Sequence, residues 1–163
     1  MAHKNIAERH VFISHLADDP DWPLGAVEAV ASAIRDSGVV AVRLDLWKQP
    51  AGARFQSVGA WLTWADDAVS GANHILCLVS PRYHMQWLRR SEDSKDGFAL
   101  SAISVISNGS RHGQNGYERI VTLRPKGCGF ECVPAELVSC QSYEWTADRH
   151  RLLSWLLKRQ RSF

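Results

Sequence analysis

The sequence of 163 residues has no long hydrophobic run and almost no net charge. No apolar stretch approaches the roughly 20 residues of a membrane-spanning helix, and residues 1–10 lack the apolar centre of a signal peptide. We therefore expect a cytoplasmic protein that does not enter a membrane. A formal net charge of +2 is too small to favour nucleic acid or an acidic membrane surface as a partner.

Cysteines are also few, and their four positions are too irregular for a disulfide framework. Cys128, Cys132 and Cys140 with His150 raise the alternative of a zinc site, but the second pair of ligands that such sites need is missing. Cys77 lies inside an apolar run and is expected in the core. P-loop, Gly-x-Gly-x-x-Gly and Gly-x-Ser-x-Gly motifs are absent from the sequence. We accordingly predict no metal and no bound cofactor.

The most informative stretch that is present covers residues 74–83, HILCLVSPRY. Its apolar part, Ile75 to Val79, carries no charge and ends at Ser80-Pro81, which indicates a fully buried strand of a parallel sheet. Proline cannot continue a central strand, so the chain must leave the sheet there. Ligands of open α/β sheets bind at the carboxyl ends of the strands. Residues 82–93 therefore follow at the edge where a functional site is expected.

Strands and helices alternate along the rest of the chain. Only the residues directly after Pro81 show no clear pattern. This alternation predicts an α/β fold with three layers, a flavodoxin-like five-stranded parallel sheet with helices on both faces. We expect one domain, residues 10–158, between short tails at 1–9 and 159–163. The expected strands are Val11–Ser14, Val39–Leu44, Ile75–Val79, Ile120–Leu123 and an edge strand within Leu137–Tyr143. The expected helices cover 26–36, about 55–69, 98–106 and Ala147–Lys158, the last with Thr146 as its N-cap. A strand is the alternative for 98–106, but its small residues and its position favour a helix.

Several short segments, in order, resemble a Toll/interleukin-1 receptor (TIR) domain, closest to the bacterial branch and its SEFIR relatives. They are FISH (12–15), DSG (36–38), VRLDLW (42–47), WADDAVSGANHILCLVSPRY (64–83) and IVTLRP (120–125). The similarity extends over roughly residues 10–157. The order and spacing of the five segments together make the resemblance specific. It implies a five-stranded parallel sheet, in agreement with the alternation of elements. It also implies that the loop 46–54 mediates self-association.

The resemblance implies an activity, because many bacterial members of this family cleave the nicotinamide–ribose bond of NAD⁺, their substrate. In those members a glutamate commonly stands four residues beyond a tryptophan, after the central strand. Here Ser91 stands four residues after Trp87 and Glu92 five residues after it. Glu92 is our candidate catalytic residue, since a carboxylate stabilises an oxocarbenium-like transition state. An alignment on the SEFIR branch instead places the glutamate near Ser101, where no carboxylate is present.

Five further residues are candidate contacts of the substrate. Ser14 and His15 follow the first strand, and Tyr83 and Trp87 follow the central strand, so all four are expected at the same edge of the sheet. Trp47 lies in the loop that the resemblance places over the pocket. Each has an alternative role: Ser14 as a cap, His15 on the surface, Trp87 in packing, and Trp47 in an interface. Glu92 likewise lies in the mixed charge run RRSEDSKD, which is typical of a solvated surface.

Two functions remain open. The first is an NAD⁺ nucleosidase, a hydrolase switched on by oligomerisation in antiviral (abortive-infection) defence. The second is a non-catalytic interaction module that self-associates or recruits a signalling partner, with a separate sensor protein as a further partner. The seven tryptophans favour the second function, because the five between Trp22 and Trp87 cannot all be core and exposed tryptophans are enriched at interfaces.

Overall fold

A computed structural model of the chain describes residues 10–16, 19–37, 41–43, 63–64, 67–69, 71–88 and 119–161. Five strands form one sheet in the order β2-β1-β3-β4-β5, and every neighbouring pair is parallel. The fold is therefore the α/β, parallel-sheet architecture that the sequence predicts. The strands are β1 (His10–Ser14), β2 (Ala41–Arg43), β3 (His74–Leu78), β4 (Ile120–Arg124) and β5 (Gln141–Glu144).

The strand that contains Cys77 occupies the centre of the sheet, as predicted from its uncharged apolar run. β3 lies between β1 and β4, and all five of its residues are buried. Ser14, the last residue of β1, is paired in register with Cys77. Because β1 and β3 are parallel and end almost level, the chain leaves both strands at the same edge.

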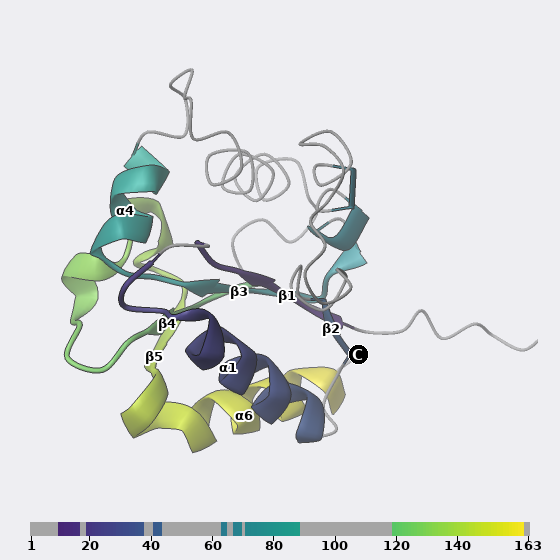
Figure 1. The fold of residues 1–163 in the computed structure, drawn as a ribbon. Helices are drawn as coiled ribbons and strands as arrows, with labels where there is room; N and C mark the ends of the chain where they lie inside the picture. Colours follow the sequence, from purple (N-terminus) through teal and green to yellow (C-terminus); the bar gives the residue numbers. More distant parts are fainter. Residues whose placement is uncertain are drawn as a thin grey trace, which may run out of the picture.

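Helices cover both faces of this sheet (Figure 1). The helices α1 (Leu24–Asp36) and α6 (Trp145–Arg161) lie together on one face, and α4 (Pro81–Leu88) lies on the opposite side. Two short 3₁₀ helices, η2 (Phe130–Cys132) and η3 (Ala135–Leu137), connect β4 to β5. Within the described part of the chain, no helix is both long and apolar enough to cross a membrane.

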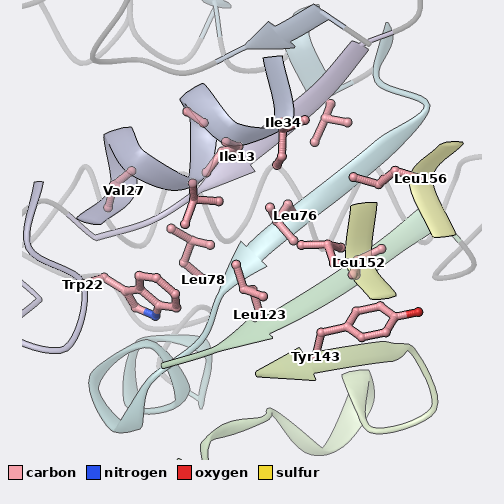
Figure 2. Close-up of a cluster of buried hydrophobic side chains, with 14 residues drawn as sticks. Ile13, Trp22, Val27, Ile34, Leu76, Leu78, Leu123, Tyr143, Leu152 and Leu156 are labelled. Carbon is pink, nitrogen blue, oxygen red and sulfur yellow. The ribbon is translucent and has the colours of Figure 1, made fainter. Parts of the chain in front are cut away.

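Strand side chains alternate between two hydrophobic clusters, one on each face of the sheet. Ile13, Leu76 and Leu123 point toward α1 and α6, where they meet Val27 and Leu152 (Figure 2). The neighbouring strand residues point the other way and pack with α4 and the segment before β3. That second cluster includes Phe12, Ile75, Cys77, Val79, Ala68, Val69, Tyr83, Trp87 and Leu137. Burial on both faces explains why the strand sequences are continuous apolar runs rather than alternating ones.

The carboxyl-terminal helix begins earlier than the sequence suggests, and the expected cap is wrong. Thr146 is the second residue of α6, not its N-cap. Instead the backbone N–H of Glu144 donates to the Asp148 carboxylate at 3.0 Å, and the Thr146 hydroxyl donates to the Glu144 carboxylate at 3.0 Å. Asp148, the fourth residue of α6, thus accepts a hydrogen bond from the backbone amide of Glu144, which directly precedes the helix. The arrangement is similar to a capping box.

The sequence interpretation missed α4 altogether. Ser80 is its N-cap: the Ser80 hydroxyl accepts a hydrogen bond from the backbone N–H of Tyr83 at 3.0 Å. Pro81 is the first helical residue, where a missing N–H costs nothing and the fixed φ favours the helix. Ser-Pro was interpreted only as the end of a strand, but it is equally a signal for the start of a helix.

The other expected elements differ in how far the structure describes them. α1 and β4 lie within two residues of their predicted bounds, and β2 is described at Ala41–Arg43 only. The expected edge strand begins later, at Gln141, because η3 occupies Ala135–Leu137. Most of the helix expected at 55–69, and all of that at 98–106, lie outside the described residues.

Candidate functional site

The carboxyl edge of the sheet brings together the ends of β1, β3 and β4 and the start of α4. The Ser14 and Tyr83 hydroxyls form a hydrogen bond of 2.9 Å between the end of β1 and α4. The two residues are 69 positions apart in sequence, so this contact depends on β1 and β3 being neighbours in the sheet. The expectation that these two segments meet at one edge is confirmed.

Both hydroxyls of this pair are enclosed by the protein. Ser14 is 2% exposed and Tyr83 is 0% exposed. Burial, as the largest cause, raises the pKa of Tyr83 well above its usual range, and the Cys77 thiol beside it acts in the same direction. The phenol is therefore neutral at physiological pH and acts here as a hydrogen-bonding group of the core.

A second hydrogen-bond network joins the loop after β1 to the end of β3. The Ser80 hydroxyl donates to the Asp19 carboxylate at 2.5 Å, and the indole N–H of Trp22 donates to the carbonyl of Val79 at 2.9 Å. The other Asp19 carboxylate oxygen accepts from the backbone N–H of Asp21 at 3.0 Å. Asp19, Trp22 and Ser80 are all at most 3% exposed, so the network closes this part of the edge. None of these three residues was among the candidates from the sequence.

The remaining predicted contacts differ in accessibility. Trp87 is 1% exposed and packs in the same hydrophobic cluster as Phe12 and Tyr83, while His15, directly after β1, is half-buried. Glu92 and Trp47 lie outside the described residues. The structure thus brings Ser14, Tyr83 and Trp87 together, but in the core below α4. Their role in binding a dinucleotide stays a prediction, as does the catalytic role of Glu92.

Arg124, at the end of β4, organises the loop that follows it. Its guanidinium donates to the Ser142 hydroxyl at 3.1 Å and to the carbonyl of Cys128 at 3.0 Å, and it lies 4.7 Å from the centre of the Phe130 ring. The same loop touches α4, because His84 Nδ1 donates to the carbonyl of Glu131 at 2.9 Å. The sequence signal for this arrangement, an arginine and a proline at a strand end, was interpreted only as the end of β4.

The cysteines lie on the α4 side of the sheet, with Cys77 and Cys132 fully buried. Burial raises the pKa of the Cys77 thiol to about 12, despite a hydrogen bond with Tyr83. Cys77 is therefore a core residue, as predicted. Across the segments that the structure describes, no three or more His, Cys, Asp or Glu side chains are placed to hold a metal ion.

Comparison with known proteins identifies the fold. No protein-family model matches the sequence, and no curated protein matches it. The crystal structure of a prokaryotic SEFIR domain is similar, with a TM-score of 0.65 and 17% sequence identity; the alignment covers 93% of this chain and 97% of that chain. This chain has a TIR/SEFIR-like fold. The resemblance drawn from the short sequence segments is confirmed at the level of fold.

The structure describes three of the five tryptophans between Trp22 and Trp87. Trp22 and Trp87 are at most 2% exposed, and Trp64 is partly buried against Phe12 with ring centres 5.9 Å apart. Trp47 and Trp61 lie outside the described residues. None of the three described tryptophans is exposed, and the expectation that the five between Trp22 and Trp87 are not all core stays a prediction. The large apolar side chains that are exposed in the described part of the chain belong to other residues, and two of them lie on α4.

Proposed function

We propose that this TIR/SEFIR-like chain is an interaction domain that self-associates through the outer face of α4. The observation that carries the proposal is a row of exposed apolar side chains at Pro81, Met85 and Leu88. Met85 is 58% exposed and Leu88 is 61% exposed. Residues spaced by four and then three positions lie on one side of a helix. α4 thus buries one apolar side and presents a second one to solvent.

Exposed single apolar residues are normal in soluble proteins, but a continuous apolar strip is more typical of an interaction surface. Methionine is enriched in such contacts, where its flexible thioether adapts to the partner. α4 is also held firmly on its inner side, by the Ser80 cap and by the Ser14–Tyr83 hydrogen bond. A rigid helix loses little conformational entropy when its outer face docks, which favours association.

Sedimentation velocity over a range of protein concentrations tests this proposal. We expect the unmodified chain to self-associate and the double variant Met85→Ser/Leu88→Ser to remain monomeric at the same concentrations. Leu24→Ser/Leu157→Ser is the matched control, since these leucines are 44% and 38% exposed on helices of the opposite face. Equal association of both double variants, or a monomer at every concentration of the unmodified chain, would contradict the proposal.

The second candidate is that the assembled domain cleaves NAD⁺ at the nicotinamide–ribose bond as an effector of antiviral defence. It is supported by the resemblance and by the position of the segment after α4, which follows a helix anchored to the end of β1 through Tyr83. Glu92 is only four residues beyond the end of α4. In this proposal its carboxylate stabilises the positive charge that develops on the ribose as the bond to nicotinamide breaks.

The enzymatic candidate is tested by measuring NAD⁺ consumption and nicotinamide release with concentrated, assembled protein. We expect Glu92→Gln to abolish turnover and Asp96→Asn, a similar change in the same charged segment, to preserve it. Equal activity of Glu92→Gln and the unmodified chain would remove Glu92 from the mechanism. If assembly occurs without NAD⁺ consumption under any condition, the interaction domain alone remains.

A further inference from the structure

The row of exposed apolar side chains on α4 has a neighbour on η2. Phe130, the first residue of η2, is 57% exposed. η2 contacts α4, and His84 of α4 donates through Nδ1 to the carbonyl of Glu131, the residue after Phe130, at 2.9 Å. Figure 1 shows the connection between β4 and β5 next to α4. Because Leu88 lies one helical turn after His84, each of the two elements presents an exposed apolar side chain beside their contact.

The Phe130 ring is held in place by Arg124 although it is exposed. The Arg124 guanidinium lies 4.7 Å from the ring centre, which is a cation–π contact. Hydrogen bonds to the Ser142 hydroxyl and to the carbonyl of Cys128 fix the guanidinium in turn. The backbone is fixed as well, because the carbonyl of Phe130 accepts from the N–H of Val133 at 3.0 Å. An aromatic ring that is already ordered loses little conformational entropy when a partner covers it, and aromatic residues are enriched in interface cores.

The charges around the Phe130 ring are of both signs. Lys126 and Glu131 are both exposed on the same loop. Hydrogen bonds from the backbone N–H groups of Glu131 and Gly129 lower the pKa of the Glu131 carboxylate, and the Arg124 guanidinium acts more weakly in the same direction, so Glu131 is charged at neutral pH. A strongly acidic or strongly basic partner therefore meets a like charge beside the ring. A second copy of the chain instead offers an opposite charge to each of the two residues.

We propose that two copies of the chain associate about a two-fold axis, with Phe130 of each copy packed on Met85 and Leu88 of the other. In a two-fold interface both copies use the same surface, so a contact between two different elements is made twice. An axis beside the contact between α4 and η2 lies between these side chains, so it places η2 of one copy opposite α4 of the other. This inference rests on the proposed self-association through α4, and it adds the second element and the symmetry. An interface in which α4 packs only on α4 does not need Phe130.

Sedimentation velocity of the unmodified chain and of single variants tests the role of Phe130. Phe130→Ser should raise the dissociation constant about tenfold or more, because a two-fold interface loses the ring twice. Leu24→Ser is the matched control on α1, on the opposite face of the sheet, and it should leave the dissociation constant unchanged. Both side chains are exposed, so at a dilution where all three proteins are monomeric, circular dichroism should show the same Tm for each.

An equimolar mixture of Phe130→Ser with the double variant Met85→Ser/Leu88→Ser tests the symmetry. Each variant alone loses both apolar contacts of the proposed interface, but a mixed pair keeps one of them, between the ring of the double variant and α4 of the Phe130→Ser chain. We therefore expect the mixture to associate more strongly than either variant alone at the same total concentration. Association of Phe130→Ser equal to that of the unmodified chain, or a mixture no stronger than its components, would overturn the two-fold arrangement and leave self-association through α4 standing. An unmodified chain that is monomeric at every concentration would overturn both proposals.

Discussion

The Ser80 hydroxyl carries two hydrogen bonds, and its removal is expected to destabilise the whole fold. It donates to the Asp19 carboxylate at 2.5 Å and accepts from the backbone N–H of Tyr83 at 3.0 Å. Ser80 is 0% exposed and Asp19 is 3% exposed, so water cannot readily replace the lost hydroxyl. Ser80→Ala therefore removes an N-cap and a hydrogen bond to a buried carboxylate in one substitution.

The magnitude follows from these two contacts. Loss of an N-cap serine typically costs about 1 kcal/mol. Loss of a hydrogen bond to a charged group costs about 1.5–3 kcal/mol, because the carboxylate stays buried without its donor. We expect Ser80→Ala to lower the free energy of unfolding by about 2–4 kcal/mol, which corresponds to roughly 4–15 °C in Tm for a chain of this size.

Urea unfolding followed by circular dichroism gives the free energy of unfolding for each variant. Ser37→Ala is the matched control: its hydroxyl also donates a hydrogen bond, here to the backbone carbonyl of Ile34 at 2.6 Å, but Ser37 is exposed. That change should cost less than about 0.5 kcal/mol. A double-mutant cycle with Asp19→Asn should show a coupling of about 0.5–3 kcal/mol with Ser80. A loss below about 1 kcal/mol in Ser80→Ala, or additive effects in the cycle, would refute the reasoning.

Three further predictions concern the core. Tyr83→Phe should cost about 1–3 kcal/mol, because it leaves the buried Ser14 hydroxyl without its partner; adding Ser14→Ala should recover part of this loss in urea unfolding, and full additivity would argue against it. The Cys77 pKa is raised from 9.0 to about 12 on folding, so the folded state favours the neutral thiol and stability should fall as pH rises from about 9 to 12. Between pH 9 and pH 12, the free energy of unfolding should fall less steeply with pH for Cys77→Ala than for the unmodified chain. The same dependence on pH in both proteins would contradict this prediction. Leu123→Ala, at a fully buried position of β4, should cost about 2–5 kcal/mol, and Leu157→Ala, 38% exposed, less than about 1 kcal/mol; similar losses would contradict the assigned packing.

The layers and the central strand could be predicted from the sequence because the signals are strong and local. The uncharged run Ile75–Val79 is stable only when it is buried on both faces of the sheet, and Pro81, which follows it, marks the end of the strand. α1 was predicted from apolar residues at helical spacing, and they are the residues that pack on the sheet. α4 was missed because it is short and its pattern is unusual: apolar side chains lie on its exposed side as well as on its buried side.

The candidate site was predictable only as a location. Topology places Ser14 beside Tyr83 once β1 and β3 are neighbours, and this is what the structure shows. The sequence does not reveal which side of α4 faces the core, so it does not reveal that both hydroxyls are buried. The Asp19–Ser80 hydrogen bond spans 61 residues and leaves no local pattern at either residue, which explains why it was not anticipated.

The two sides of α4 bear differently on the two candidate functions. Its inner side holds Tyr83 and Trp87 in a closed, hydrogen-bonded core, and its outer side presents Met85 and Leu88 to solvent. A substrate that contacted Tyr83 would have to displace α4, break the Ser14 hydrogen bond and expose two large aromatic side chains. A partner that docks on Met85 and Leu88 breaks none of these contacts and buries apolar surface instead. If NAD⁺ is nevertheless cleaved, we expect the reacting groups outside this closed core, Glu92 among them, or on a neighbouring copy of the chain.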